Sequence, residues 1–131
     1  MVLWMIKQSM YPLLPPHGSL PGLIDTDLDG FLRRLRSESN ALLWAGLVFA
    51  SIMFISTPLL TVGLPLPACL LRGRTLALHT ERIIAHPWYP LRQSMSVVRL
   101  AAGMCWGADP AVRAHFRLPP YPPDPGTFRQ A

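Results

Sequence analysis

The sequence predicts a mainly α-helical protein: a small, irregular helical domain with one long apolar helix and extended proline-rich arms at both ends. An uncharged run from Ser39 to Leu71, bracketed by arginines, is the first observation behind this prediction. The second is the proline content, 15 in 131 residues, about twice the average share. Between the prolines, apolar residues recur every three or four positions, which indicates helices. Because proline interrupts helices, we expect several helices joined by extended segments.

A chain of this length holds a single domain, whose core is modest in size. We place the helical domain at residues 25–117. An apolar, proline-containing arm precedes it at residues 1–24, and a proline-rich tail follows at residues 118–131. We expect the arm to form a short helix or an extended segment that lies along a surface rather than folding alone.

The first helix of the domain is expected to begin near Asp29, because acidic residues suit a helix N-terminus. With Asp25 and Asp27, this residue also matches the opening half of an EF-hand calcium loop. The twelfth position of that loop, which needs a bidentate glutamate, is Arg36 here. We therefore interpret the three acids as a helix start.

The apolar helix is expected over residues 41–57, where Pro58 ends or kinks it. A bilayer-spanning helix needs about 20 apolar residues, and the uncharged run is long enough to supply them. The run can be buried in lipid, against a partner or in the protein's own core, and the sequence leaves all three open. The residues expected to form this membrane or hydrophobic interface are Leu43, Trp44, Leu47, Val48, Phe49, Ile52, Phe54 and Ile55.

Three further helices are predicted after a breaker-rich connection. The first covers about residues 68–85. The second begins at Pro90 and stops at Gly107, and the third is a short helix over residues 111–116 with Asp109 as its N-cap. The apolar seam of the second helix consists of Leu91, Met95, Val98, Ala102 and Cys105. The tail beyond Leu118 is expected to be extended and polyproline-like, which suits binding in a groove.

The net charge of +5 comes from the second half of the helical region. Arginine favours fixed, bidentate pairing with carboxylates or phosphates. No nucleic-acid-binding motif is present, so we do not expect a nucleic-acid partner. Residues 72–117 carry two acids and the arginines Arg72, Arg74, Arg82, Arg92, Arg99, Arg113 and Arg117. We expect partner binding through Arg92, Arg99, Trp106, Asp109, Arg113 and Tyr121.

No residue pattern typical of an active site appears in the chain. Cys69 and Cys105 have no zinc-ligand spacing, and we interpret them as small buried hydrophobes, with a disulfide between them left open. The sequence has no nucleotide-binding glycine loop, no nucleophile elbow and no HExxH motif. We therefore predict a protein without catalytic, cofactor-binding or metal-binding residues of its own.

Four segments, taken in order, resemble a known family. They are Asp29-Gly-Phe-Leu-Arg-Arg-Leu35, Pro90-Leu-Arg-Gln93, Met104-Cys-Trp-Gly-Ala-Asp-Pro-Ala-Val-Arg113 and Leu118-Pro-Pro120. Over about residues 25–120 the chain resembles the small helical subunit of gluconate 2-dehydrogenase, often called subunit 3. It is also similar to the helical segment that precedes the flavin domain in some long-chain alcohol oxidases. The "Asp-Pro-x-Val-Arg, then Pro-Pro" ending is the most specific of these motifs.

The resemblance implies a non-catalytic accessory subunit that binds, stabilises or tethers a large flavoprotein of the glucose–methanol–choline type. The FAD and the catalytic residues are then expected on that partner, and no cofactor on this chain. The chain departs from the gluconate enzyme in lacking a clear export signal, so we expect it to be membrane-associated on the cytoplasmic side, with lipid as a further contact. The alternative is a single-pass structural subunit of a membrane complex, with residues 41–63 crossing the bilayer.

Overall fold

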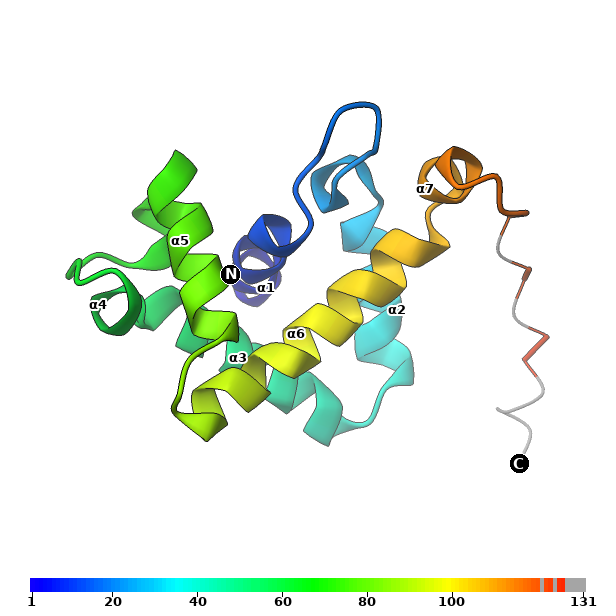
Figure 1. The fold of residues 1–131 in the computed structure, drawn as a ribbon. Coiled ribbons are helices and arrows are strands. Elements are labelled where there is room, and N and C mark those ends of the chain that lie inside the picture. The colour runs from blue at the N-terminus through cyan, green and yellow to red at the C-terminus, as the bar shows by residue number, and fades with distance from the viewer. Residues whose placement is uncertain (121, 124, 127–131) are drawn as a thin grey trace.

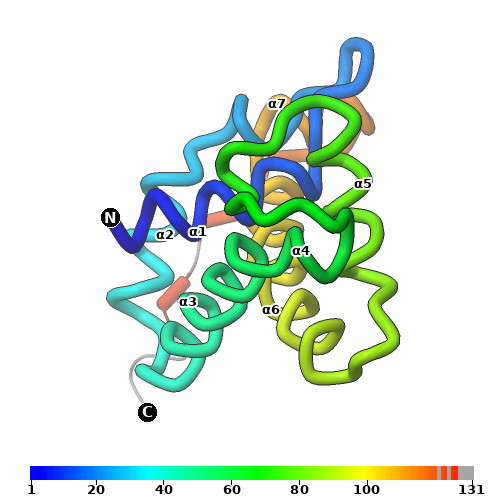
Figure 2. Tube along the Cα trace, turned by 90° about the vertical axis from the view of Figure 1, so that its left-hand side faces the viewer, coloured from blue at the N-terminus to red at the C-terminus, as the bar shows by residue number. Residues whose placement is uncertain are grey.

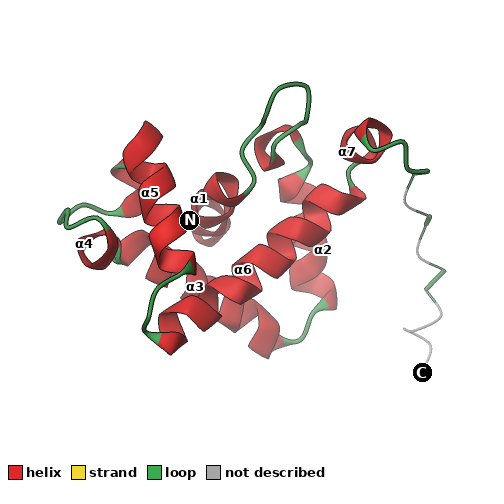
Figure 3. Cartoon of the chain, in the orientation of Figure 1, coloured by secondary structure: helices red, strands yellow, loops and turns green. Residues whose placement is uncertain are grey.

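The computed structural model describes residues 1–120, 122, 123, 125 and 126, and these residues form helices joined by loops, with no strand (Figures 1 and 3). The α-helices are α1 (Val2–Met10), α2 (Leu28–Glu38), α3 (Ala41–Ser56), α4 (Pro58–Thr61), α5 (Gly73–Ile84), α6 (Tyr89–Ala108) and α7 (Pro110–His115). Three short 3-10 helices are η1 (Tyr11–Leu13), η2 (Leu23–Asp25) and η3 (Ala68–Leu70). The mainly helical fold class is therefore confirmed.

Helix α3 lies at the centre of the fold, where it packs against α6 on one side and α1 on another. Figure 1 shows α6 running diagonally across α3. Ala50 of α3 and Ala102 of α6 are fully buried, and such small side chains let two helix backbones approach closely. Around them the core is filled by larger residues, including Leu47, Phe54 and Met95.

The N-terminal segment forms the short helix that was one of its two predicted conformations, but this helix is packed into the core and does not lie along a surface. Residues 2–10 form α1, and Ile6 and Met10, four positions apart on one face, are fully buried in the core. Between α1 and α3, the buried hydroxyls of Ser9 and Ser51 are hydrogen-bonded at 3.0 Å. The first proline, Pro12, lies beyond α1, so nothing interrupts this helix. The segment therefore belongs to the core of the domain.

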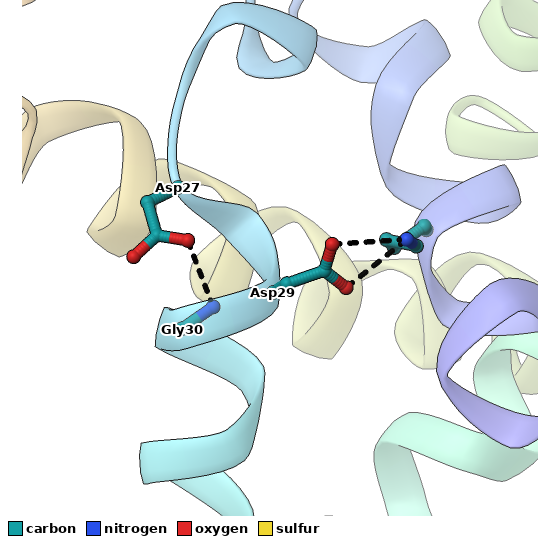
Figure 4. Close-up of polar contacts among 4 residues, drawn as sticks. Asp27, Asp29 and Gly30 are labelled. Atoms are coloured by element: carbon teal, nitrogen blue, oxygen red, sulfur yellow. Dashed lines mark hydrogen bonds and ion pairs between the residues drawn. The ribbon is translucent and has the colours of Figure 1, made fainter.

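The acidic cluster at the start of α2 is structural, because each acid has its own partner. The Asp27 side chain is the N-cap and accepts a hydrogen bond from the Gly30 backbone N–H at 3.0 Å. Asp29 pairs with the Lys7 ammonium group of α1, the unlabelled side chain in Figure 4, at 3.0 Å. Asp25 accepts from the Gly22 backbone N–H at 2.9 Å. Helix α2 thus begins at Leu28, one residue before the predicted position.

The predicted long apolar helix is shorter than expected. Helix α3 has 16 residues, starting after Asn40, whose side chain caps the Leu43 N–H at 2.8 Å. Pro58 has no N–H for the helical ladder, so the chain breaks at Thr57 and restarts as α4. The predicted span over residues 41–63 is therefore divided between two helices. Among the described residues, none of the helices combines the length and apolar character needed to cross a membrane.

The later helices follow the sequence pattern, with shifted ends. Helix α5 begins at Gly73 rather than near Ala68, because η3 and an extended Leu71 come first. Helix α6 continues through Gly107 to Ala108. Asp109 then caps α7, accepting from the N–H groups of the two residues after Pro110 at 2.9 and 3.2 Å. The predicted seam of α6 is buried in full.

Gly22 fills a position that has no room for a side chain. A Cβ there would collide with the backbone nitrogen of Pro16 and lie 2.9 Å from the carbonyl carbon of Pro15. We expect Gly22→Ala to lower the free energy of unfolding by about 1–3 kcal/mol, as overpacking does. Gly46→Ala is the matched control, because nothing lies within 4 Å of its added Cβ in α3. It should raise stability by about 0.5–1 kcal/mol. Urea denaturation measures both, and equal effects would contradict the account.

Candidate functional site

The outer face of α3 exposes a continuous row of mostly apolar residues, which we call the apolar stripe. Its members within α3 recur at intervals of three and four positions, and Leu59 of α4 follows after the break at Thr57. They are Leu42, Ala45, Phe49, Ile52, Ser56 and Leu59. The exposed fractions are 81% for Leu42, 56% for Phe49, 40% for Ile52 and 59% for Leu59. Figure 2 shows α3 leading directly into α4 along one side of the molecule.

The stripe exists because α3 is apolar on every side. One face, with Leu47, Ala50 and Phe54, is fully buried against α6 and α1. Most helices at a protein surface carry polar residues on the face that is exposed to solvent. Here Phe49 and Ile52 occupy the opposite face. The core is complete without the stripe, so the stripe is surplus apolar surface, and such surface marks interaction sites.

A shallow hollow of about 300 Å³ extends the stripe beyond the end of α3. Ser56 and Leu59 belong both to the stripe and to the wall of this hollow, and the other lining residues are Leu64, Pro65, Leu66 and Pro67. The leucines at positions 64 and 66 are also exposed, at 38% and 46%. The stripe and the hollow together form one apolar surface with a concave end, which suits a protruding apolar side chain of a partner.

The eight residues predicted to form a hydrophobic interface divide into three groups. Leu47 and Phe54 are each 1% exposed and belong to the core, which corrects their assignment to an interface. Trp44, Val48 and Ile55 are partly buried against the core. Leu43, Phe49 and Ile52 are exposed. Sequence reasoning missed the exposed Leu42 and Leu59. The signal that could have identified them is their position in the same series of apolar residues, three or four positions from the next member.

Two of the residues predicted to bind a partner, Arg92 and Arg99, lie on the solvent face of α6. Arg92 is exposed, donates a hydrogen bond to the His86 carbonyl at 3.2 Å, and lies 5.5 Å from the centre of the Tyr89 ring. Arg99 follows two turns later on the same face, with no ion pair to an acid within the described positions. These two guanidinium groups are placed where carboxylates of another chain can reach them.

The predicted residues near α7 make contacts within the chain. The Trp106 indole N–H donates to the Pro21 carbonyl at 2.9 Å, and the ring meets Phe116 edge-on at 6.1 Å. Asp109 caps α7. Arg113 donates from Nε to the Pro119 carbonyl at 2.5 Å and from Nη1 to the Gly107 carbonyl at 3.4 Å. Tyr121 lies outside the described residues.

A buried histidine, missed by sequence reasoning, joins α3, α4 and α5. His79 is fully buried, with its ring against that of Phe54 at 4.7 Å. Its Nε2 lies 2.9 Å from the Phe54 carbonyl, which can only accept, so Nε2 carries the proton. Its Nδ1 therefore accepts from the Thr61 hydroxyl at 2.5 Å. Arg82 donates to the Thr61 carbonyl at 2.7 Å and completes the cluster.

Burial lowers the pKa of His79, and the hydrogen bond to the Phe54 carbonyl offsets this only in part. The imidazole of His79 is therefore protonated more readily in the unfolded chain than in the folded chain. The contribution of neutral His79 to stability is present above about pH 6.5 and is lost as the pH falls below that value. We expect the free energy of unfolding to fall by up to about 1.4 kcal/mol per pH unit there. Thermal melts from pH 7 to 5 measure this, and a His79→Gln variant with the same pH dependence would contradict it.

The described residues contain no group of three or more His, Cys, Asp or Glu side chains placed to hold a metal ion. Cys69 and Cys105 are not joined to each other in the structure; Cys69 is partly buried and Cys105 is buried. Burial raises the pKa of the Cys105 thiol, whose sulfur lies 3.6 Å from the Thr26 hydroxyl. A buried thiol with a raised pKa is a poor nucleophile. Cys105 thus acts as a core side chain.

Comparisons with known proteins give no relative. No protein-family model, no curated protein and no solved structure matches the chain.

Proposed function

We propose that this chain is a non-catalytic accessory subunit that binds, stabilises or tethers a large FAD-dependent alcohol or sugar oxidoreductase subunit. The observation that carries the proposal is the apolar stripe beside a completed core. The partner's identity as a glucose–methanol–choline-type flavoprotein rests on the resemblance of residues 25–120 to the small helical subunit of gluconate 2-dehydrogenase. On this proposal the FAD and the reacting groups belong to the partner.

The spacing of the stripe supports a helical docking element on the partner. Residues at alternating intervals of three and four form a straight seam along a helix, and a second helix packs into such a seam with side chains between side chains. Phe49 lies near its centre and is the large aromatic anchor that interface centres favour. The exposed Arg92 and Arg99 add charges that pair with acids of the partner and fix its orientation.

Purification of the tagged chain from its native host in mild detergent tests the proposal. The proteins that accompany it are identified by mass spectrometry, and a visible absorption spectrum is recorded. We expect a large flavoprotein in fixed ratio to the chain, with flavin absorption bands. Recovery with membrane-spanning subunits and no flavin would contradict the proposal, and so would recovery of the chain alone. A carbonate wash of the membranes then separates a subunit held by protein contacts, which is released, from one held in lipid, which stays.

A further inference from the structure

A groove between α2 and α6 has the features of a binding site for a proline-rich segment. Its volume is about 790 Å³. Helix α2 contributes Phe31, Arg34, Leu35 and Glu38, and its C-cap residue is Ser39. Helix α6 contributes Gly103, Met104, Gly107 and Ala108, and the tail contributes Pro122 and Pro123. Figure 1 shows the described parts of the tail, in red, on the same side of the molecule as α2. The groove is separate from the apolar stripe and shares no residue with it.

Two glycines one helical turn apart make the room in this groove. A Cβ added at Gly103 or at Gly107 would meet no atom within 4 Å. A mid-helix glycine lowers helix stability by about 0.5–1 kcal/mol relative to alanine, so α6 carries a local weakness here. The exposed Met104 lies between them, and the partly buried rings and methyl groups of Phe31 and Leu35 face the same space. Flexible methionine and aromatic side chains suit the flat faces of proline rings.

The end of α7 directs the tail toward the groove. Arg117 has a φ of 57°, the left-handed conformation that ends a helix in a Schellman motif. The Leu118 N–H donates to the Arg113 carbonyl at 2.8 Å, and the Arg117 N–H donates to the Ala114 carbonyl at 3.0 Å, as that motif requires. The Arg113 side chain then holds the Pro119 carbonyl and also reaches the Gly107 carbonyl of the groove floor. One arginine thus connects the tail to the groove.

The polar groups of the groove complement a proline-rich backbone. Such a backbone offers carbonyl acceptors and few N–H donors, and it forms no internal hydrogen bonds. The groove offers donors, the Arg34 guanidinium and the Ser39 hydroxyl. The Ser39 oxygen is shielded from solvent and has no hydrogen-bond partner within the part of the chain that the structure describes. A shielded hydroxyl without a partner is costly, and a proline carbonyl is an acceptor that would satisfy it.

We propose that the α2–α6 groove is a binding site for extended proline-rich chain, and that its occupant in the free protein is the chain's own tail, through Pro119, Pro122 and Pro123. The tail therefore binds to the groove of its own chain and does not extend away from the domain.

A spin label on the tail of the full-length chain tests the proposal. The label is attached to Pro125→Cys in a Cys69→Ser background, where Cys105 is 6% exposed and stays unlabelled. We expect strong broadening of the backbone amide signals of Gly103, Met104 and Leu35, and none for amides of α5. Gly103→Leu fills the groove without a clash at its Cβ and should remove the broadening. Ser96→Leu, exposed on the same face of α6 two turns earlier, is the matched control and should keep it.

A mixture of labelled and isotope-enriched chains identifies the source of the tail. Binding in cis predicts no broadening when the label and the observed amides are on different chains. Broadening in the mixture would show that the tail of a second copy occupies the groove, and would overturn the proposed occupant. Absence of broadening at the groove amides in every sample would overturn the site itself.

Discussion

Replacing Phe54 with alanine is expected to lower the free energy of unfolding by about 3–5 kcal/mol, the range for truncating a buried phenylalanine. Phe54 is 1% exposed and lies where α3 meets α5. Its ring covers the imidazole of His79, so the truncation opens a cavity and also admits water to a buried polar cluster. A domain of this size has a total stability of about 5–15 kcal/mol, so the variant should be close to unfolding at 37 °C.

The matched control is Phe49→Ala, the same substitution five residues earlier on the same helix. Phe49 is 56% exposed, so its truncation removes little buried area and should change stability by less than about 1 kcal/mol. Urea denaturation followed by circular dichroism measures both variants. If Phe49→Ala destabilised the chain as much as Phe54→Ala, α3 would be packed by a different face from the one described.

The second large effect is expected on assembly. Arginine at both Phe49 and Ile52 places two charges on the apolar stripe, three positions apart and on the same face. A docked partner would have to bury both charges without counter-ions, which is strongly unfavourable. We expect binding to weaken by at least about 2 kcal/mol, roughly thirtyfold in Kd, while the thermal midpoint of the isolated chain stays unchanged.

Ala111→Arg with Ala114→Arg is the control for this double variant. Both residues are exposed, they are also three positions apart, and the change in charge is identical, but they lie on α7, away from the stripe and from Arg92 and Arg99. The control should still recover the partner in an affinity purification, and the stripe variant should not. Loss of the partner in both variants would mean that added positive charge acts at any site, and retention in both would exclude the stripe as the docking surface.

The sequence predicted helix ends well where a capping residue or a proline marks them. Asp109 and Pro110 mark the start of α7, and Pro58 marks the end of α3, because their effects act within a turn of the chain. The N-terminal segment was predicted less well. One contact of this segment in the core joins Ser9 to Ser51, which lies 42 residues later in the sequence. No local sequence pattern contains such a contact.

The orientation of α3 could not be predicted for a different reason. A helix that is apolar on every side has no polar face to identify the solvent side, so Phe49 and Phe54 were equivalent in the sequence. Only packing against α6 and α1 distinguishes them. The burial of His79 was also invisible, because its acceptor on α3 and its donor on α4 lie 25 and 18 residues earlier.

Hydroxyl-radical labelling of the chain, alone and in the complex recovered from its host, tests most directly whether the apolar stripe is the docking surface. Phe49 should be oxidised readily in the isolated chain and protected in the complex, while buried Phe54 stays unmodified in both and reports that the fold is intact. Equal oxidation of Phe49 in the two samples, with Phe54 still unmodified, would show that the partner binds elsewhere and would contradict the account.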